Sequence, residues 1–168
     1  MLDTNLLFDL ALIQFADQTP ERALKEKIWS SVRVLKTQGA VARLLSSAQS
    51  YRFITTHLVL VEVGVLARRT LWPKEVFGDR PPEWPFLTAL RKTMTELRLG
   101  VHELSGEPRS SLRDAFGPTD ADLVATTLAL SKVPGGAALL TTDRRLANWC
   151  MENRVPCDHF DPLVPSPS

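Results

Sequence analysis

The sequence predicts an α/β sandwich, in which helices cover both faces of a parallel sheet. Short apolar runs of strand length recur along the chain, and segments with helical spacing separate one run from the next. Parallel strands are buried on both faces, so they read as continuous apolar runs rather than as alternating ones. In such a sheet, a ligand site is expected outside the carboxyl ends of the strands.

The expected elements follow one another in a simple order. The strands are short, and the last is weak: residues 1–2, 52–55, 100–104, 137–141 and 157–160. Helical spacing extends over residues 6–16, 20–36, 40–48, 57–69, 84–97, 120–131 and 144–152. The stretch 71–85 holds four prolines and is expected to be a loop.

The 168 residues fit one domain with a sizeable core. We expect a single domain over residues 1–160 and a flexible tail over residues 161–168, which carries three prolines. The sequence has no run of 18 apolar residues and no basic export signal. The expected location is therefore the cytoplasm, with no membrane partner and with Cys150 and Cys157 as reduced thiols.

Asp3 follows the first expected strand and precedes a long apolar helix. A carboxylate that enters an apolar interior costs free energy unless a partner compensates it. Asp3 could cap the helix, but Thr4 or Asn5 could accept the same backbone N–H alone, which leaves Asp3 without a structural task. Asp9, in the same stretch, is expected to be an ordinary helix acid.

Glu62 and Asp143 are acids next to two other expected strands. Glu62 lies in a helix with apolar neighbours on both sides, so no face of that helix is clearly exposed, and a lone Glu there is expected to be paired or functional. Asp143 comes two residues after Thr141, where the fourth expected strand ends. Its structural alternative is to cap the helix that begins at Arg144.

Asp120 and Asp122 lie at the start of another expected helix. Thr119 resembles the N-cap, and Asp122 falls three residues later, as in a capping box. That arrangement gives Asp122 a structural role. Asp120 could simply favour the positive end of the helix dipole.

Taken together, Asp3, Glu62, Asp120 and Asp143 can all reach one rim of the expected sheet. Carboxylates packed closely repel one another and raise one another's pKa values. A divalent cation removes this conflict, and Mg²⁺ or Mn²⁺ prefers oxygen ligands. A cation bound in this way can activate water and stabilise charge on a phosphodiester, so the four acids indicate a metal-dependent nuclease.

Four sequence blocks resemble those of PIN-domain ribonucleases. They are LDTNLL at residues 2–7, ITTHLVLVEV at 54–63, PTDADLVATT at 118–127 and LLTTDRRL at 139–146. They occur in the family's order and span nearly the whole chain. The stretch 19–50 and the loop near Pro81 make this chain longer than the compact VapC-type toxins of toxin–antitoxin pairs, which it otherwise resembles.

The resemblance implies a three-layer α/β/α sandwich with a central parallel sheet and an Mg²⁺ or Mn²⁺ site. It implies an endoribonuclease that cleaves RNA with metal-activated water and that a cognate antitoxin could inhibit, and it makes a homodimer plausible. Carried over by position, the catalytic and metal-binding acids are Asp3, Glu62, Asp120 and Asp143. Supporting roles fall to Asn5 and Thr142, with Asp122 as a reserve ligand if the third block is shifted.

Because RNA affinity is mainly electrostatic and the net charge is only +1, any RNA must be held by a local patch. The best candidate contacts are Arg144 and Arg145, which follow a site acid. The pairs at 68–69 and 91–92 are better explained as solvated helix surface, and Trp149 as core.

Three other functions are consistent with parts of the pattern. The chain could be a PIN fold that binds RNA or protein without cutting, or a PIN nuclease of RNA processing that has no antitoxin. A phosphotransferase of the haloacid-dehalogenase kind also begins with Asp after its first strand. That chemistry needs a second Asp two residues later, where this chain has Asn5.

Overall fold

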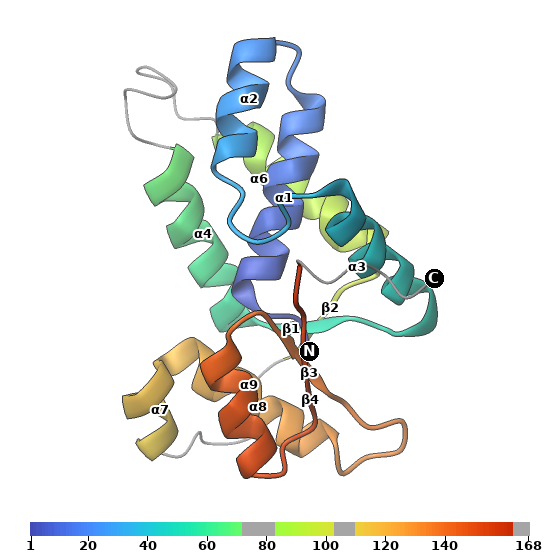
Figure 1. Cartoon of the computed structure of the whole chain (residues 1–168), viewed down its shortest axis with the longest axis vertical. Helices are drawn as coiled ribbons and strands as arrows, with labels where there is room; N and C mark the ends of the chain where they lie inside the picture. The colour runs from blue at the N-terminus through green and yellow to red at the C-terminus, as the bar shows by residue number, and fades with distance from the viewer. Residues whose placement is uncertain (72–82, 103–109, 163–168) are drawn as a thin grey trace.

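The computed structural model describes residues 1–71, 83–102 and 110–162, and these are mostly helical (Figure 1). The expected three-layer α/β/α sandwich with a central parallel sheet is wrong. The described strands form two separate parallel pairs, β1 (Ile54–Thr56) with β2 (Gly100–His102), and β3 (Leu139–Thr141) with β4 (Cys157–His159). The apolar runs mark where the strands lie, but in each pair the register covers only three residues, so no continuous central sheet forms among the described residues.

The N-terminal segment lies between the two strand pairs. The N–H of Leu2 donates to the carbonyl of Ile54 at 2.8 Å, and the N–H of Asp3 donates to the carbonyl of Leu140 at 3.2 Å. Leu2 and Leu140 form an isolated parallel bridge, not a strand. The segment therefore carries Asp3 to the ends of β1 and β3.

Every expected helix is present, although some boundaries differ. They are α1 (Thr4–Gln18), α2 (Arg22–Ser30), α3 (Gln38–Ser50), α4 (His57–Leu71), α6 (Glu83–Glu96), α8 (Pro118–Leu130) and α9 (Arg144–Glu152). The sequence did not predict α7 (Ser110–Phe116). Residues 72–82 of the expected loop and 163–168 of the expected tail lie outside the described residues.

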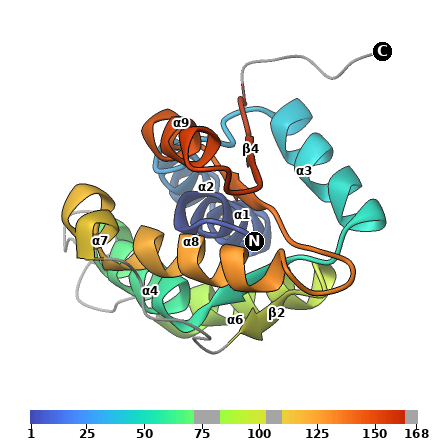
Figure 2. The same ribbon diagram turned by 90° about the horizontal axis from the view of Figure 1, so that it is seen from below.

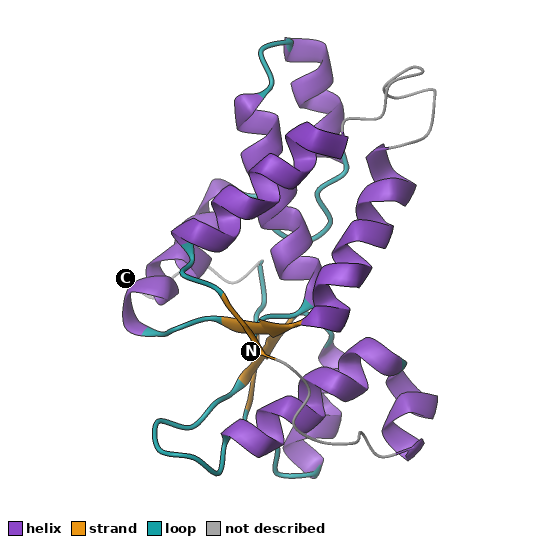
Figure 3. Ribbon diagram, turned by 180° about the vertical axis from the view of Figure 1, so that it is seen from behind, coloured by secondary structure: helices purple, strands orange, loops and turns teal. Residues whose placement is uncertain are grey.

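The short strands lie where two groups of helices meet. One group contains α1, α2, α4 and α6, and the other contains α7, α8 and α9, as the front and back views show (Figures 1 and 3). Seen from below, the second group lies in front of the first (Figure 2). The N-terminus lies at this junction (Figure 1). Elements of both groups can therefore place side chains near Asp3.

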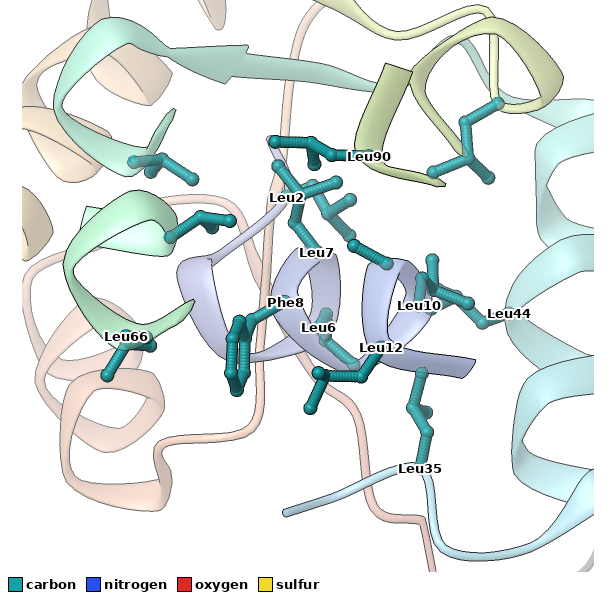
Figure 4. Packing of buried hydrophobic residues seen from close by; sticks show 14 of the residues in the cluster. Leu2, Leu6, Leu7, Phe8, Leu10, Leu12, Leu35, Leu44, Leu66 and Leu90 are labelled. Atoms are coloured by element: carbon teal, nitrogen blue, oxygen red, sulfur yellow. The ribbon is translucent and has the colours of Figure 1, made fainter. Parts of the chain in front are cut away.

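Helix α1 is the centre of the core. It packs against α6, α2 and α4, and its buried side chains point in nearly all directions, which explains its uniformly apolar sequence (Figure 4). Phe86 of α6 contacts two aromatic rings of α1, Phe8 at 6.2 Å and Phe15 at 6.3 Å between ring centroids. Burying each such aromatic or leucine side chain contributes about 1.5–3 kcal/mol.

Asp9 is not an ordinary helix acid. Its side chain is fully buried, and its carboxylate accepts the backbone N–H groups of Arg33, Val34 and Leu35. Burial raises the pKa of Asp9, whereas these three hydrogen bonds oppose the rise. Asp9 therefore fastens the chain after α2 to the central helix, a long-range role that local spacing does not reveal.

Candidate active site

Asp3 has a structural task after all, because it is the N-cap of α1. Its Oδ1 accepts the N–H of Leu6 at 2.9 Å. Its Oδ2 accepts the hydroxyl of Thr141 at 2.8 Å and the N–H of Thr142 at 3.0 Å. Burial raises the pKa of Asp3 more than these hydrogen bonds lower it. The carboxylate is thus held in one orientation by two distant parts of the chain.

Asp143 caps α9, which is the structural alternative that the sequence offered for it. Its Oδ1 accepts the N–H groups of Arg145 at 2.7 Å and Leu146 at 3.1 Å. Its own N–H donates to the hydroxyl oxygen of Thr141 at 3.1 Å. Thr141 therefore connects Asp143 with Asp3 through a single side-chain oxygen.

Glu62 lies on α4 and is half-buried, and the hydroxyl of Thr4 donates to its Oε2 at 2.7 Å. The expectation that α4 has no exposed face is wrong, because Val61 is 63% exposed and Val65 is 41% exposed. Glu62 is nevertheless on the inner part of the helix, where it meets the first turn of α1. This hydrogen bond fixes Glu62 relative to the start of α1, which Asp3 caps.

Asp120 is the acid on which the charges of the other three act. It lies in the first turn of α8, which begins at Pro118 after Gly117, whose φ of 90° suits glycine. The pKa of Asp120 is raised to about 7, first by burial and then by the negative charges of Asp3, Glu62 and Asp143. The charges of the other three acids predicted from the sequence therefore act on Asp120.

Asp122 is not part of a capping box. Because α8 begins at Pro118 rather than after Thr119, Asp122 lies too far into the helix to cap it. Its side chain is 1% exposed, and neither carboxylate oxygen finds a hydrogen-bond donor among the described residues. The hydroxyl of Thr126, one turn later on the same face, is also buried with no partner in the described part of the chain. Buried polar atoms in this state are rare and call for a partner such as water or an ion.

The supporting residues turn out differently from their predicted roles. Asn5 lies within the first turn of α1, and among the described residues its side chain makes no hydrogen bond to the four acids. Thr142 contributes its backbone N–H rather than its hydroxyl. Sequence reasoning missed Thr4 and Thr141, which make the side-chain contacts. Both are next to the predicted residues in the quoted blocks. Only the packing of α1 against α4 and the position of Asp3 beside β3 select them.

The two candidate RNA contacts point to different places. Arg145 lies over the ring of Phe116 at 5.7 Å, and that ring also contacts Trp149, which packs against the core as expected. Arg144 instead lines a surface pocket beside α9. Of the two arginines, only Arg144 therefore lines this pocket.

The donor set fits a divalent cation by its chemistry. Carboxylate oxygens are what Mg²⁺ and Mn²⁺ prefer, and a cation would relieve the repulsion felt by Asp120. Among the residues that the structure describes, no three His, Cys, Asp or Glu side chains are already arranged to hold one ion. Asp3, Glu62, Asp120 and Asp143 would therefore hold a cation only after their side chains rearrange.

Comparisons with known proteins identify no relative of this chain: no family model, curated protein or solved structure matches it. Within the described part of the chain, none of the helices has the length and apolar character needed to cross a bilayer.

Proposed function

We propose that this protein is an Mg²⁺- or Mn²⁺-dependent endoribonuclease with its active site at Asp3, Glu62, Asp120 and Asp143. The observation that carries the proposal is the pKa of Asp120, raised to about 7 by burial and by the charges of the other three acids. Strongly perturbed carboxylates that perturb one another are typical of sites for catalysis or metal binding. The four sequence blocks, in the order found in PIN-domain ribonucleases, support the same chemistry.

Three of the acids are held in fixed orientations by hydrogen bonds. Asp3 is held by Thr141 and Thr142, Glu62 by Thr4, and Asp143 by the first turn of α9. Hydrogen bonds of this kind orient the carboxylates of metal sites. Asp120 has no hydrogen bond among the described residues, so its negative charge is the least compensated of the four.

The raised pKa of Asp120 links proton and cation binding. When bound, a divalent cation supplies a polarised water and offsets charge on the scissile phosphodiester. Without it, Asp120 is about half protonated at neutral pH. A carboxylate must be deprotonated to act as a ligand, so cation binding should release a proton from this residue. The negative charges of the other three acids contribute to the raised pKa of Asp120.

The decisive experiment measures RNA cleavage by the purified chain. Wild type, Asp120→Asn and the exposed control Asp114→Asn are incubated with a labelled single-stranded RNA in Mg²⁺, Mn²⁺ or EDTA. We expect cleavage that requires the cation and that falls about 100-fold or more in Asp120→Asn, since losing a ligand or its orientation typically costs this much. Absence of cleavage by wild type in both cations, or wild-type cleavage by Asp120→Asn, contradicts the proposal.

We further propose that the nuclease acts as the toxin of a toxin–antitoxin pair, which rests on the sequence resemblance alone. Induced expression of wild type should arrest growth of a bacterial host, whereas Asp120→Asn at equal protein level should not. Growth arrest by both variants would show that the toxicity does not come from the acidic site.

A further inference from the structure

A surface pocket of about 490 Å³ lies between α9 and the chain that follows it, residues 154–159. Resting on the proposed nuclease function, we propose that this pocket binds one nucleotide of single-stranded RNA next to the acidic site. In this role Arg144 and Arg154, near the two ends of α9, bind the phosphate groups on either side of that nucleotide. The size is within the range of small-ligand sites.

One wall of the pocket is a single face of α9. Arg144, Ala147, Asn148 and Met151 line the pocket, and their spacing of three and four residues puts them on one side of the helix. Arg144 directly follows Asp143, so the wall begins at the acidic site. Arg145 lies outside the lining and is over Phe116.

The rest of the lining comes from the segment that follows α9 and from β4. It includes Arg154, Pro156, Cys157 and His159. The Nε2 of His159 is 3.3 Å from the carbonyl of Thr142, whose N–H donates to Asp3. This part of the lining is therefore connected to the acidic site through one residue of the β3–α9 turn.

The charges in the pocket favour a phosphate. Arg144 and Arg154 are both exposed, and neither forms an ion pair within the described part of the chain. No described acid lines the pocket, because the adjacent Asp158 lines a different hollow. Arg154 has a φ of 57°, a left-handed conformation that glycine or asparagine adopts more often after a helix. The chain therefore carries an arginine at this position despite a cost in backbone conformation. Each guanidinium can bind phosphate oxygens in a fixed geometry.

The rest of the lining suits the sugar and base. Met151 is 74% exposed and, with Ala147 and Pro156, offers an apolar surface that adapts to different bases. Asn148 supplies both a donor and an acceptor. Proteins bind RNA mainly through its phosphates, so an acidic active site needs positively charged side chains nearby. The arginines of this pocket supply that charge without a large net charge on the protein.

The first test measures binding without cleavage. A fluorescein-labelled single-stranded RNA of mixed sequence is titrated in EDTA with the full chain, its Arg144→Ala and Arg154→Ala variants, and the control Arg22→Ala. Arg22 is a suitable control because its side chain is 92% exposed on α2, in the group of helices away from α9. We expect each pocket variant to bind about tenfold more weakly. We also expect each to lose about 0.7 from the slope of log affinity against log salt, with Arg22→Ala unchanged.

The second test locates the RNA with the two cysteines of the chain. Cys150 is fully buried, whereas Cys157 is half-buried, lines the pocket, and has a pKa lowered by a hydrogen bond with Cys150. Iodoacetamide should therefore label Cys157, and bound RNA should slow this labelling several-fold in wild type. In Arg144→Ala and Arg154→Ala, the same RNA concentration should protect Cys157 much less.

The outcomes separate this inference from the proposed nuclease. If Asp120→Asn abolishes cleavage while Arg144→Ala and Arg154→Ala bind RNA like Arg22→Ala, the nuclease stands and the pocket is overturned. If the pocket variants lose RNA binding but wild type cleaves nothing in Mg²⁺ or Mn²⁺, the RNA pocket stands and the nuclease is overturned. Undetectable RNA binding by wild type, or full labelling of Cys157 with RNA bound, overturns the pocket.

Discussion

The hydroxyl of Thr141 donates a 2.8 Å hydrogen bond to Oδ2 of Asp3, and the two residues are 138 positions apart in the chain. The same hydroxyl oxygen accepts the N–H of Asp143 at 3.1 Å. One threonine at the end of β3 thus orients two of the four acids. The contact joins the N-terminal segment to the turn before α9.

Replacing Thr141 with valine should therefore damage both stability and the site. Thr141→Val keeps the shape but leaves Oδ2 of Asp3 without its hydroxyl donor and the N–H of Asp143 without an acceptor. We expect a loss of about 1–3 kcal/mol in the free energy of unfolding, measured by urea denaturation. RNA cleavage should fall more than the lost fraction of folded protein explains.

The matched control is Thr127→Val. Thr127 is also fully buried, but its hydroxyl donates to the carbonyl of Leu123 within α8, which the helix already satisfies. Equal losses of unfolding free energy and of RNA cleavage in the two variants would contradict the role given to the Thr141 hydroxyl.

Asp120 should make the cation-free protein less stable as pH rises. Its pKa is about 7 in the folded chain, against 3.8 for an unperturbed aspartate, which represents the unfolded chain. Between these values the folded state holds a proton that the unfolded state has lost, so stability falls as pH rises through this window and levels off above the folded pKa. Asp120→Asn should remove this part of the slope and melt at a higher temperature than wild type at pH 8. A control, Asp114→Asn on the exposed surface of α7, should keep the slope.

A divalent cation should reverse this destabilisation. Mn²⁺ or Mg²⁺ that binds only the folded chain stabilises it by about 2.7 kcal/mol at a concentration 100 times its dissociation constant. We expect calorimetric melting at pH 8 to shift upward with the cation in wild type and little in Asp120→Asn. The shift should shrink at pH 5, where Asp120 is protonated. An equal shift in both proteins would place the cation elsewhere.

Asp9 should be essential for folding stability but not for catalysis. In Asp9→Asn, one carboxylate oxygen becomes an NH₂ group that faces backbone donors among Arg33, Val34 and Leu35. Each buried donor left without a partner costs about 1–3 kcal/mol. The variant should unfold at clearly lower urea concentration yet cleave RNA normally when folded. The control Asp17→Asn, which loses only an exposed ion pair with Lys25, should change stability by less than about 1 kcal/mol.

Among the residues of α6, Phe86 should contribute most to the free energy of unfolding. Phe86→Ala removes the ring that contacts Phe8 and Phe15, and large-to-small changes of this kind cost about 3–5 kcal/mol. Its neighbour Leu87 is 41% exposed, so Leu87→Ala should cost far less. Similar unfolding midpoints for the two variants would show that α6 packs against α1 differently in solution.

The four acids and the helix caps show which features of the site could be predicted from sequence patterns. Their expected places near the strand ends, together with the resemblance to PIN-domain blocks, selected Asp3, Glu62, Asp120 and Asp143. In the structure the charges of the other three act on Asp120. The capping roles were predicted less well. Asp143 caps α9 as the sequence allowed, whereas Asp3 rather than Thr4 or Asn5 caps α1, and Gly117 rather than Thr119 precedes α8. A cap depends on where the first turn begins, and a shift of one or two residues changes the capping residue.

What the sequence by itself determined is local. Apolar spacing located the seven expected helices and the short runs around β1 to β4. A half-buried element imposes a period on the chain, and a fully buried one reads as a continuous apolar run. What only the tertiary structure decided is long-range: strand pairing that stops after three residues, the bond from Thr141 to Asp3, and the burial of Asp9 against residues 33–35. The two side-chain contacts join residues that are between 24 and 138 positions apart. Their geometry arises from how α1 packs among its neighbours, and no local period in the sequence encodes it.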